Sequence, residues 1–378
     1  MTTRTVRARN FRSLDRFAWS PEGVCLLAGA NGTGKSTVLE VVLFLRILFE
    51  RGHEAAFAKV GASYFRSIRS SEDEPVVFEV EVGSLLWRLR FPMATAGPKD
   101  TFGEELYRDG ELILRAAMFQ QTWFLGRESL PLDAVRCCAK VLWDRGTVEW
   151  MKPLVEAVTN VHVYEEYWLN QITQAREVTA RQFFLHGSGA NVWSVLSNWK
   201  ASATRWEGRF EWVMEGVRRA FPGLLATLEF ENGFPMIFPP GAAGVEGGLP
   251  PWLAADGLLT GLLHLTAIAG AAKGSLVAFD EPENHLHPYA IRELIASMRE
   301  RAETHDLTII LTTHSPVVMN EFRDYGERVF VLDRSDPARA LPVALTELHS
   351  EEWLAQAKLG TLYDRLAFGA PPGTAAGQ

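Results

Sequence analysis

The residues with the clearest chemical meaning form a glycine-rich loop between a short apolar run and a helix-like run. The loop reads Gly29-Ala30-Asn31-Gly32-Thr33-Gly34-Lys35-Ser36-Thr37 and fits the pattern GxxxxGK[ST]. Its glycines let backbone N–H groups approach a phosphate, and the helix N-terminus behind them attracts anions. Lys35 adds a charge for the β- and γ-phosphates, and Ser36 offers a hydroxyl to Mg²⁺. The spacing predicts a nucleoside triphosphate site.

Two later strand-like runs end in side chains that suit the same chemistry. Ser275–Phe279 leads into Asp280 and Glu281, which predicts a buried strand that delivers one carboxylate to Mg²⁺ and a second to the attacking water. Leu307–Thr313 is rich in β-branched residues and stops at His314, which we expect to sense the γ-phosphate. Together these runs predict the second half of a triphosphate site.

Several elements must position these residues. Val24–Ala28 is a short apolar run typical of a buried strand, and residues 36–45 have the pattern of a helix. The N-terminal run 5–14 indicates an edge strand that leads toward the loop. Alternating apolar residues over 75–116, with Asp109-Gly110 between two runs, predict an antiparallel sheet that contains a hairpin. Residues 329–333 fit a last strand of the nucleotide-binding sheet.

The segment from about residue 130 to 221 has a helical pattern and holds most of the 12 tryptophans. One interpretation is a set of stacking platforms for unpaired bases, interleaved with Arg176, Arg181, Lys200, Arg205 and Arg209. The favoured interpretation is a helical lobe whose core and partner interface use bulky anchors.

Composition is that of an ordinary globular protein. The chain has 378 residues, 47% of them hydrophobic and 22% charged, and a net charge of −8. The negative charge argues against a broadly basic nucleic-acid binder but allows a local basic groove. The N-terminus has no signal-peptide pattern, and the apolar stretches 39–49 and 258–272 favour buried helices over membrane spans. The three cysteines lack metal-ligand or disulfide spacing, so we expect a cytoplasmic protein without a membrane partner.

The motifs taken together resemble a known family, the ABC-type ATPases related to SMC and Rad50 proteins and, within them, the short OLD-like ATPases. The resemblance rests on the phosphate loop and on three further strings: Asn10-Phe11-Arg12-Ser13-Leu14, Asp280-Glu281-Pro282-Glu283-Asn284-His285-Leu286-His287-Pro288 and Thr313-His314-Ser315-Pro316. It implies an α/β fold, namely a P-loop ABC ATPase head with a mixed sheet, an antiparallel β subdomain and an inserted α-helical lobe.

The resemblance also implies that ATP is hydrolysed with Mg²⁺ between two heads. The signature loop of each head, here Leu253–Leu259 with Asp256 and Gly257, would close on the nucleotide of the other head. Ala255 stands where the family usually has Ser, which removes a hydroxyl donor and predicts slow turnover or an ATP-held switch. Arg12 is expected to contact the nucleotide. The glutamine of the Q-loop stays undecided, with Gln120 and Gln121 as candidates.

The order of motifs predicts four segments: the first part of the head with the phosphate loop and antiparallel sheet (1–128), the helical lobe (129–225), the second part of the head (226–368) and a disordered tail (369–378). Lys35 and Asp280 lie too close in sequence for the long coiled coil of SMC and Rad50 chains. The residues after His314 are too few for the Toprim nuclease domain of OLD proteins.

Three functional hypotheses follow. The leading one is a cytoplasmic ATPase that dimerises head to head around Mg·ATP and controls a separate effector, such as a nuclease or toxin, in antiviral defence or DNA maintenance. The second is a DNA-binding repair or recombination ATPase of the RecF kind. The third is a structural scaffold held together by ATP with little turnover.

Overall fold

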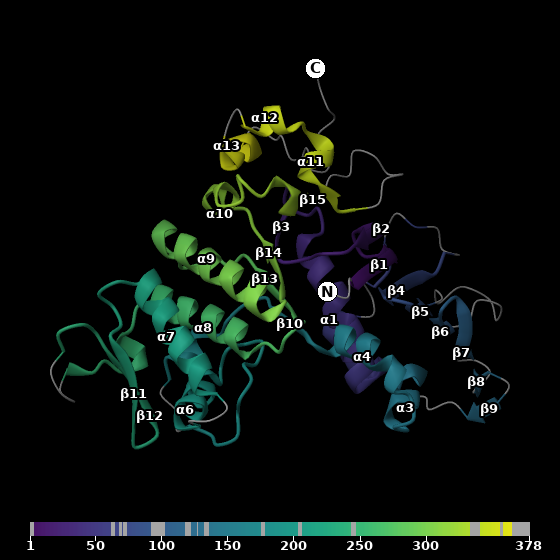
Figure 1. Cartoon of the computed structure of the whole chain (residues 1–378), viewed down its shortest axis with the longest axis horizontal. Coiled ribbons are helices and arrows are strands. Elements are labelled where there is room, and N and C mark those ends of the chain that lie inside the picture. Colours follow the sequence, from purple (N-terminus) through teal and green to yellow (C-terminus); the bar gives the residue numbers. More distant parts are fainter. Residues whose placement is uncertain are drawn as a thin grey trace.

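Two sheets organise the chain, one at its centre and one to the side (Figure 1). The structure is a computed structural model and describes residues 4–61, 65–67, 70, 74–91, 103–117, 122–126, 128–131, 136–174, 178–202, 206–242, 247–332, 341–355 and 358–364. The combination of a mixed sheet, an antiparallel sheet and helices confirms the expected α/β class.

The central sheet has six strands, in the spatial order β10 (Val161–Tyr164), β13 (Leu276–Asp280), β14 (Thr308–Thr312), β3 (Val24–Ala28), β15 (Val329–Val331) and β16 (Val343–Ala344). The first five strands run parallel, and β16 pairs antiparallel with β15. In β3, Cys25 and Leu27 enter one hydrophobic core while Leu26 and Ala28 enter another. Burial on both faces explains why these strands are uninterrupted apolar runs.

Helix α1 (Lys35–Arg51) fills the space between the two sheets. Its side chains Val41, Phe44 and Leu48 recur at helical spacing and are fully buried. Phe44 lies at the centre of an aromatic cluster that joins α1 to the side sheet, together with Phe11, Phe57, Phe65, Phe78 and Phe91. Three helices extend this layer: α2 (His53–Val60), α3 (Cys138–Asp144) and α4 (Lys152–Thr159).

The opposite face of the central sheet is covered by a second group of helices: α5 (Leu169–Ile172), α6 (Val192–Ala201), α7 (Glu207–Ala220), α8 (Asp256–Gly270) and α9 (Pro288–His305). Helix α8 is buried along nearly its whole length, which explains its apolar composition and confirms that residues 258–270 form a buried helix. A hairpin of β11 (Thr227–Glu231) and β12 (Phe234–Phe238) flanks this group (Figure 1).

The side sheet has eight antiparallel strands, in the spatial order β2 (Leu14–Trp19), β1 (Arg4–Phe11), β4 (Val76–Val82), β5 (Leu85–Phe91), β6 (Gly103–Arg108), β7 (Glu111–Ala117), β8 (Thr122–Leu125) and β9 (Glu128–Pro131). Asp109 and Gly110 both have positive φ angles and form the predicted hairpin turn between β6 and β7. The prediction of an N-terminal edge strand was wrong. The chain folds back through β2, so β1 has a neighbour on each side.

The C-terminal part closes the top of the molecule in Figure 1 with four short helices: α10 (Pro316–Asn320), α11 (Leu345–Leu348), α12 (Glu351–Ala355) and α13 (Leu359–Asp364). Among the described residues, short 3-10 helices connect other elements: η3 (Glu149–Met151), η5 (Pro251–Leu253) and η6 (Gly326–Arg328). Strand β15 confirms the predicted strand from residue 329, while Asp333 and the tail 369–378 lie outside the described residues. Within the described residues, no helix is long and apolar enough to cross a bilayer.

The segment expected as a helical lobe, 129–225, contains more than helices. Strand β10 pairs in parallel with β13 along the edge of the central sheet, and α3 and α4 pack in the same core as α1. A four-residue apolar run such as Val161–Tyr164 is too short to show a period, so the sequence pattern of the surrounding helices concealed it.

Candidate functional site: a triphosphate site at the edge of the central sheet

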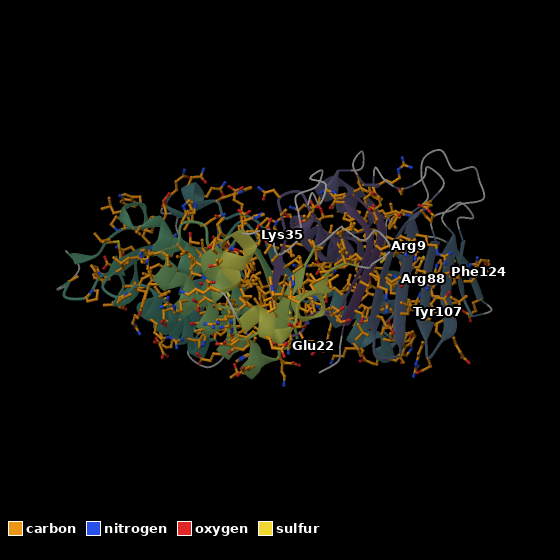
Figure 2. The ribbon with its side chains drawn as sticks, turned by 90° about the horizontal axis from the view of Figure 1, so that it is seen from above. Arg9, Glu22, Lys35, Arg88, Tyr107 and Phe124 are labelled. Carbon is orange, nitrogen blue, oxygen red and sulfur yellow. The ribbon has the colours of Figure 1, made fainter. Side chains whose placement is uncertain are left out.

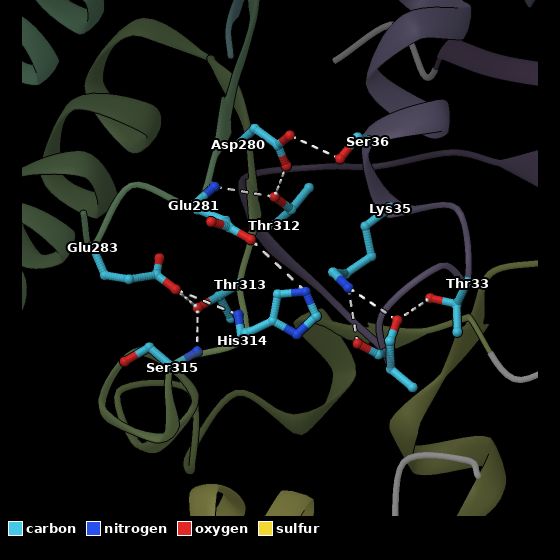
Figure 3. Close-up of polar contacts among 12 residues, drawn as sticks. Thr33, Lys35, Ser36, Asp280, Glu281, Glu283, Thr312, Thr313, His314 and Ser315 are labelled. Atoms are coloured by element: carbon cyan, nitrogen blue, oxygen red, sulfur yellow. Dashed lines mark hydrogen bonds and ion pairs between the residues drawn. The ribbon is translucent and has the colours of Figure 1, made fainter. Parts of the chain in front are cut away.

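The motif residues meet where the parallel strands of the central sheet end (Figure 3). Asp280 at the end of β13 lies opposite Thr312 at the end of β14, and Thr312 lies opposite Leu27 of β3. The loops that leave these strands therefore start side by side. This edge is where open α/β sheets bind their ligands.

The phosphate loop is folded tightly on itself. Thr33 donates from its backbone N and from its Oγ1 to the carbonyl of Ala30, at 3.3 and 2.9 Å. Gly34 has a φ of 109°, and a Cβ there would lie 2.5 Å from the Oγ of Ser13, so this position requires glycine. Asn31 and Gly32 remain exposed at the tip of the loop. The loop is thus shaped before any ligand binds.

Lys35 is buried, with only 6% of its surface exposed, and it lies against the inside of this loop. Its Nζ donates to the carbonyl oxygens of Gly29 at 2.9 Å and Ala30 at 3.2 Å. Burial lowers the pKa of the ammonium to about 8, although the nearby carboxylates Asp280 and Glu281 act in the opposite direction. A polyphosphate would supply the negative charge that this buried cation lacks.

Ser36 and Asp280 come from opposite ends of the sequence and meet directly. The Ser36 Oγ donates to Asp280 Oδ2 at 2.8 Å, while the other carboxylate oxygen accepts a hydrogen bond from Thr312 Oγ1. The neighbouring Thr37 points elsewhere, and its Oγ1 accepts from Ser13 at 3.1 Å. Hydroxyl and carboxylate oxygens are the hard ligands that Mg²⁺ prefers. Because the side chains of Ser36 and Asp280 meet, these two residues fit the ion.

Glu281 follows in a strained conformation that aims its side chain at the site. Its φ is +50°, in the left-handed region that non-glycine residues rarely adopt. Its backbone N donates to the carbonyl and to the Oγ1 of Thr312, both at 3.2 Å. The carboxylate accepts from Asn284 Nδ2 at 3.4 Å and lies 3.8 Å from His314 Nε2. Such strain is typical of functional positions.

His314 stands between Glu281 and the phosphate loop (Figure 3). Burial and the charge of Lys35 lower the pKa of its imidazole, which therefore stays neutral near pH 7. Its Nδ1 lies 2.9 Å from the hydroxyl of Tyr363 in α13, and that hydroxyl donates to the carbonyl of Gly29 at 3.2 Å. The C-terminal helix therefore links the histidine to the phosphate loop. No pattern in the sequence pointed to Tyr363.

Glu283 has a role that the sequence reasoning did not assign. One of its oxygens accepts hydrogen bonds from Thr313 Oγ1 and from the backbone N of His314, the latter at 3.3 Å. Burial raises the pKa of its carboxyl group. Thr313 Oγ1 in turn accepts from the backbone N of Ser315 at 2.8 Å. Glu283 thus fixes the loop that carries His314.

Helix α8, which begins at the predicted signature loop, contacts the loop after β13 at two points. A Cβ at Gly257 would lie 2.8 Å from the carbonyl oxygen of His285, so glycine permits this approach. Further along, His264 Nε2 lies 2.9 Å from the carbonyl of Pro282, and its Nδ1 lies 3.1 Å from the hydroxyl of Tyr167. Burial lowers the pKa of His264 to about 4, so it is neutral and donates to Pro282. Helix α8 therefore holds the backbone directly after Glu281.

The first residues of α8 do not join the phosphate loop of their own chain. Helix α8 packs in the core on one face of the central sheet, and α1 packs in the core on the other face. Ala255 caps α8 in an extended conformation without a side-chain hydrogen bond, and it is exposed together with Asp256. A contact of Asp256 and Gly257 with a nucleotide in a second chain stays a prediction.

Arg12 lies in the turn between β1 and β2. Its guanidinium holds both carboxylate oxygens of Glu40 in α1 and the backbone carbonyl of Val60 at the end of α2. The structure thus assigns it a bracing role between the side sheet and α1. Its expected contact with a nucleotide stays a prediction.

Strand β10 adds acidic groups beside the site. It ends in Glu165 and Glu166, and together with Tyr167, His264 and Glu281 these residues line a cavity of about 300 Å³. A signal existed in the sequence, since Val161–Tyr164 followed by two acids repeats the pattern of Leu276–Phe279 followed by Asp280-Glu281. Gln120 and Gln121 lie outside the described residues.

Most described tryptophans of the tryptophan-rich segment are packed in the core or against it, whereas Trp168 is 51% exposed. Trp193 and Trp199 are buried in the core, and Arg209 lies over the ring of Trp206 while it donates to the carbonyl of Gly270 at 2.9 Å. Lys200 is paired with Glu229 at 2.5 Å. These residues act as bulky core anchors, while Arg176 and Arg205 lie outside the described residues.

Comparisons with known proteins give one match to a protein family. Residues 241–320 match the family described as "AAA domain, putative AbiEii toxin, Type IV TA system". This stretch contains α8, Asp280, Glu281 and His314. The chain is also 43% identical over 47 residues to "Protein ea59" of Escherichia phage lambda, a match that covers 12% of this chain and 9% of that protein.

Among solved structures, the chain is similar to heads of SMC proteins at low sequence identity. The SmcHead bound to the C-winged helix domain of ScpA gives a TM-score of 0.47 at 14% identity, over 84% of this chain and 91% of that one. The SMC head domain from Thermotoga maritima gives 0.42 at 14% identity, over 85% and 92%. The Smc head domain with an extended coiled coil bound to the C-terminal domain of ScpA, derived from Pyrococcus furiosus, gives 0.45 at 13% identity, over 85% and 92%.

The family match covers the acidic strand and the histidine, and the fold places the phosphate loop against both. The recognition drawn from the motifs agrees with this match, since residues 241–320 are similar to an ATPase domain of the AAA type.

Proposed function

We propose that this protein binds and hydrolyses ATP at the edge of its central sheet. The observation that carries the proposal is the hydrogen bond of 2.8 Å between Ser36 and Asp280. It joins the phosphate-loop helix to the acidic strand at the point where a metal-bound triphosphate needs both. Bound there, Mg²⁺ would neutralise charge on the β- and γ-phosphates.

The protein's own groups divide the remaining work. The backbone N–H groups of Gly29–Gly34 and the Lys35 ammonium hold the phosphate oxygens. Glu281 orients the attacking water and accepts its proton. Its carboxylate can do so because it is partly exposed and the basic side chain next to it, His314, is neutral. His314 reaches from the next strand toward the γ-phosphate, and the Gly29–Tyr363–His314 hydrogen bonds keep its ring in place.

The active form that we propose is a head-to-head dimer. Asp256 and Gly257 lie at the N-terminus of α8, which packs on the opposite face of the central sheet from α1, so in this proposal a second chain brings them to the nucleotide. Since the cap residue is Ala255, the γ-phosphate would lack a hydroxyl donor there. We therefore expect slow turnover, with the ATP-bound dimer as the long-lived state.

The dimer would control a separate effector, such as a nuclease or a toxin, in antiviral defence or DNA maintenance. Support comes from the matched family, whose description names a toxin of a type IV toxin–antitoxin system.

Glu281→Gln tests the proposal most directly. This variant keeps the shape of the side chain and removes the base, so ATP hydrolysis should fall by about 10²–10⁴-fold while ATP binding persists. Light scattering after gel filtration should show an ATP-dependent dimer for Glu281→Gln and none for Lys35→Ala. Hydrolysis by Glu281→Gln at the wild-type rate would refute the catalytic assignment, and an ATP-bound monomer would refute the dimer.

A further inference from the structure

The side sheet carries an arginine-lined hollow on the face turned away from α1. We call it the arginine groove and define it by Arg7, Arg9, Arg16, Arg88 and Arg90. It has a volume of about 520 Å³, and Glu79 is the one acidic residue among the described residues that line it. A surface excess of arginine is notable on a chain whose net charge is −8.

Strand register explains how arginines from distant parts of the sequence come together. Arg16 of β2 pairs with Arg9 of β1, Arg9 pairs with Val77 of β4, and Val77 pairs with Arg90 of β5. One row across four strands thus holds three arginines and no acid. Neighbouring strands lie about 4.8 Å apart, so the guanidinium groups form a row of closely spaced cations.

The next row alternates in charge and is largely neutralised. Arg7 and Arg88 flank Glu79, at 3.7 and 2.6 Å, and Arg7 also pairs with Glu81 at 2.7 Å. Glu105 accepts from Arg88 at 3.4 Å and lies 3.7 Å from Arg90. The positive charge that remains lies largely on Arg9 and Arg90 of the first row.

Two arginines of the first row are available to a ligand. Arg9 is exposed, and no carboxylate among the described residues lies within ion-pair distance of it. Arg90 is 48% exposed and has a single long contact with Glu105. Planar guanidinium groups match phosphate oxygens in pairs, which makes a row of arginines suited to a phosphate chain.

Aromatic and basic side chains continue along the same face. Arg115 of β7 lies opposite Glu105 of β6 and pairs with Phe124 of β8, which is 40% exposed. Figure 2 shows Arg9, Arg88, Tyr107 and Phe124 on this sheet, to one side of Lys35. An exposed phenylalanine beside arginines offers a face on which a base can stack.

We propose that this face of the side sheet binds single-stranded nucleic acid, with Arg9 and Arg90 of the arginine groove on phosphates and Phe124, farther along the face, beneath a base. The proposal concerns a surface separate from the ATP site. It also places nucleic-acid binding away from the tryptophan-rich segment, where the sequence had suggested it.

Fluorescence anisotropy with a labelled oligothymidylate of about 20 nucleotides tests the proposal, using the full chain without nucleotide. Wild type should bind more weakly as salt rises. The double variant Arg9→Glu/Arg90→Glu should lose at least about tenfold in affinity, and the slope of log affinity against log salt should shrink by about 1.4, since each lost phosphate contact contributes about 0.7. Arg323→Glu reverses an exposed arginine beyond this face and should bind as wild type does.

Further binding measurements distinguish nucleic acid from other anions as the ligand. Phe124→Ala should weaken binding of the oligonucleotide at least about fivefold and leave binding of inorganic polyphosphate unchanged, because only bases stack. Equal behaviour of Phe124→Ala toward both ligands would overturn the assignment to nucleic acid. Tighter binding of polyglutamate than of the oligonucleotide, or wild-type affinity in Arg9→Glu/Arg90→Glu, would overturn it as well. Thermal unfolding and basal ATP hydrolysis of each variant show that its fold is intact.

Discussion

The two sheets of this protein place their functional side chains at different positions along their strands. The central sheet is buried on both faces, so its strands can offer functional side chains only where they end, at Asp280 and in the loops after Thr312 and Ala28. The side sheet is buried on one face only, so alternate residues such as Arg9 and Arg90 remain exposed along its strands. The parallel strands therefore form a point-like site, confined to their ends, and the antiparallel strands form an extended surface along their length.

Asp280→Asn should produce the largest loss of activity and tests the point-like character of the first site. Loss of groups that merely orient a metal ligand typically costs 10–100-fold, so replacement of a ligand itself should reduce ATP hydrolysis at least about 100-fold. The measurement is phosphate release at saturating Mg²⁺. Rescue by Mn²⁺ in place of Mg²⁺ would support a metal role for this carboxylate.

The matched change on the side sheet is Glu79→Gln. It also removes one partly buried carboxylate, which is held by Arg88 at 2.6 Å, but far from the phosphate loop. Hydrolysis should stay within about twofold of wild type, since a partly exposed ion pair contributes little. If both variants lost activity equally, the distinction between the two sheets would fail.

His264 tests whether support beneath the sheet edge matters to catalysis. His264→Leu removes the donor to Pro282, directly after Glu281, and leaves that buried carbonyl unpaired. We expect kcat to fall about tenfold, equivalent to about 1.4 kcal/mol, with little change in KM. Steady-state kinetics over a range of ATP concentrations provide both constants.

Conservative variants distinguish the effect of the His264 hydrogen bond from the effect of packing by its ring. His264→Gln keeps a donor and should recover most of kcat, whereas Tyr167→Phe removes only the hydroxyl that lies 3.1 Å from His264 Nδ1 and should cost less than His264→Leu. A loss of kcat in His264→Gln as large as in His264→Leu would show that ring packing, rather than the hydrogen bond, is what counts.

Much of the site was predictable because its signals are local. The loop 29–36, the acids at 280–281 and the histidine at 314 each follow a strand pattern, and short strings of this kind carry their own geometry. The antiparallel sheet and its Asp109-Gly110 turn were predictable for the same reason, since alternation and turn residues are read within a few positions.

The missing parts depend on contacts between distant residues. Tyr363 reaches Gly29 across more than 300 positions, and His264 meets Pro282 through helix packing, so neither has a sequence signature. The arginine row exists only through the register of β2, β1, β4 and β5. Strand β10 shows no period, because it has only four residues, and the one signal for it is the pair of acids that follows.

Lys35 makes the central site sensitive to pH. Burial lowers its pKa to about 8, so the free protein loses the ammonium charge as pH rises through 8. Bound phosphates favour the charged form, so nucleotide binding takes up a proton above pH 8, and affinity should fall by up to tenfold per pH unit there. Titration with a non-hydrolysable ATP analogue between pH 7 and 9.5 measures the effect.

Lys35→Arg is the control, because a guanidinium stays protonated throughout this range. Its affinity should be weaker than that of wild type but flat with pH. A falling profile in Lys35→Arg would assign the titration to another group. Binding of an oligonucleotide to the arginine groove should not change over the same range, since arginines carry its charge, and this contrast would sharpen the comparison of the two sheets.

The smallest expected effect lies at the start of α8, beyond the edge of the central sheet. Ala255→Ser adds an N-cap hydroxyl, which should stabilise the helix by about 1 kcal/mol and offer a donor to a nucleotide bound by a second chain. We expect ATP hydrolysis to rise two- to fivefold, equivalent to about 0.5–1 kcal/mol.

Ala254→Ser places the same hydroxyl one residue before the cap and should change neither quantity. A gain in thermal stability without a gain in hydrolysis would show that the hydroxyl only caps the helix and does not reach a nucleotide. A gain that grows with protein concentration would instead show that the point-like site of the central sheet is finished by a second copy.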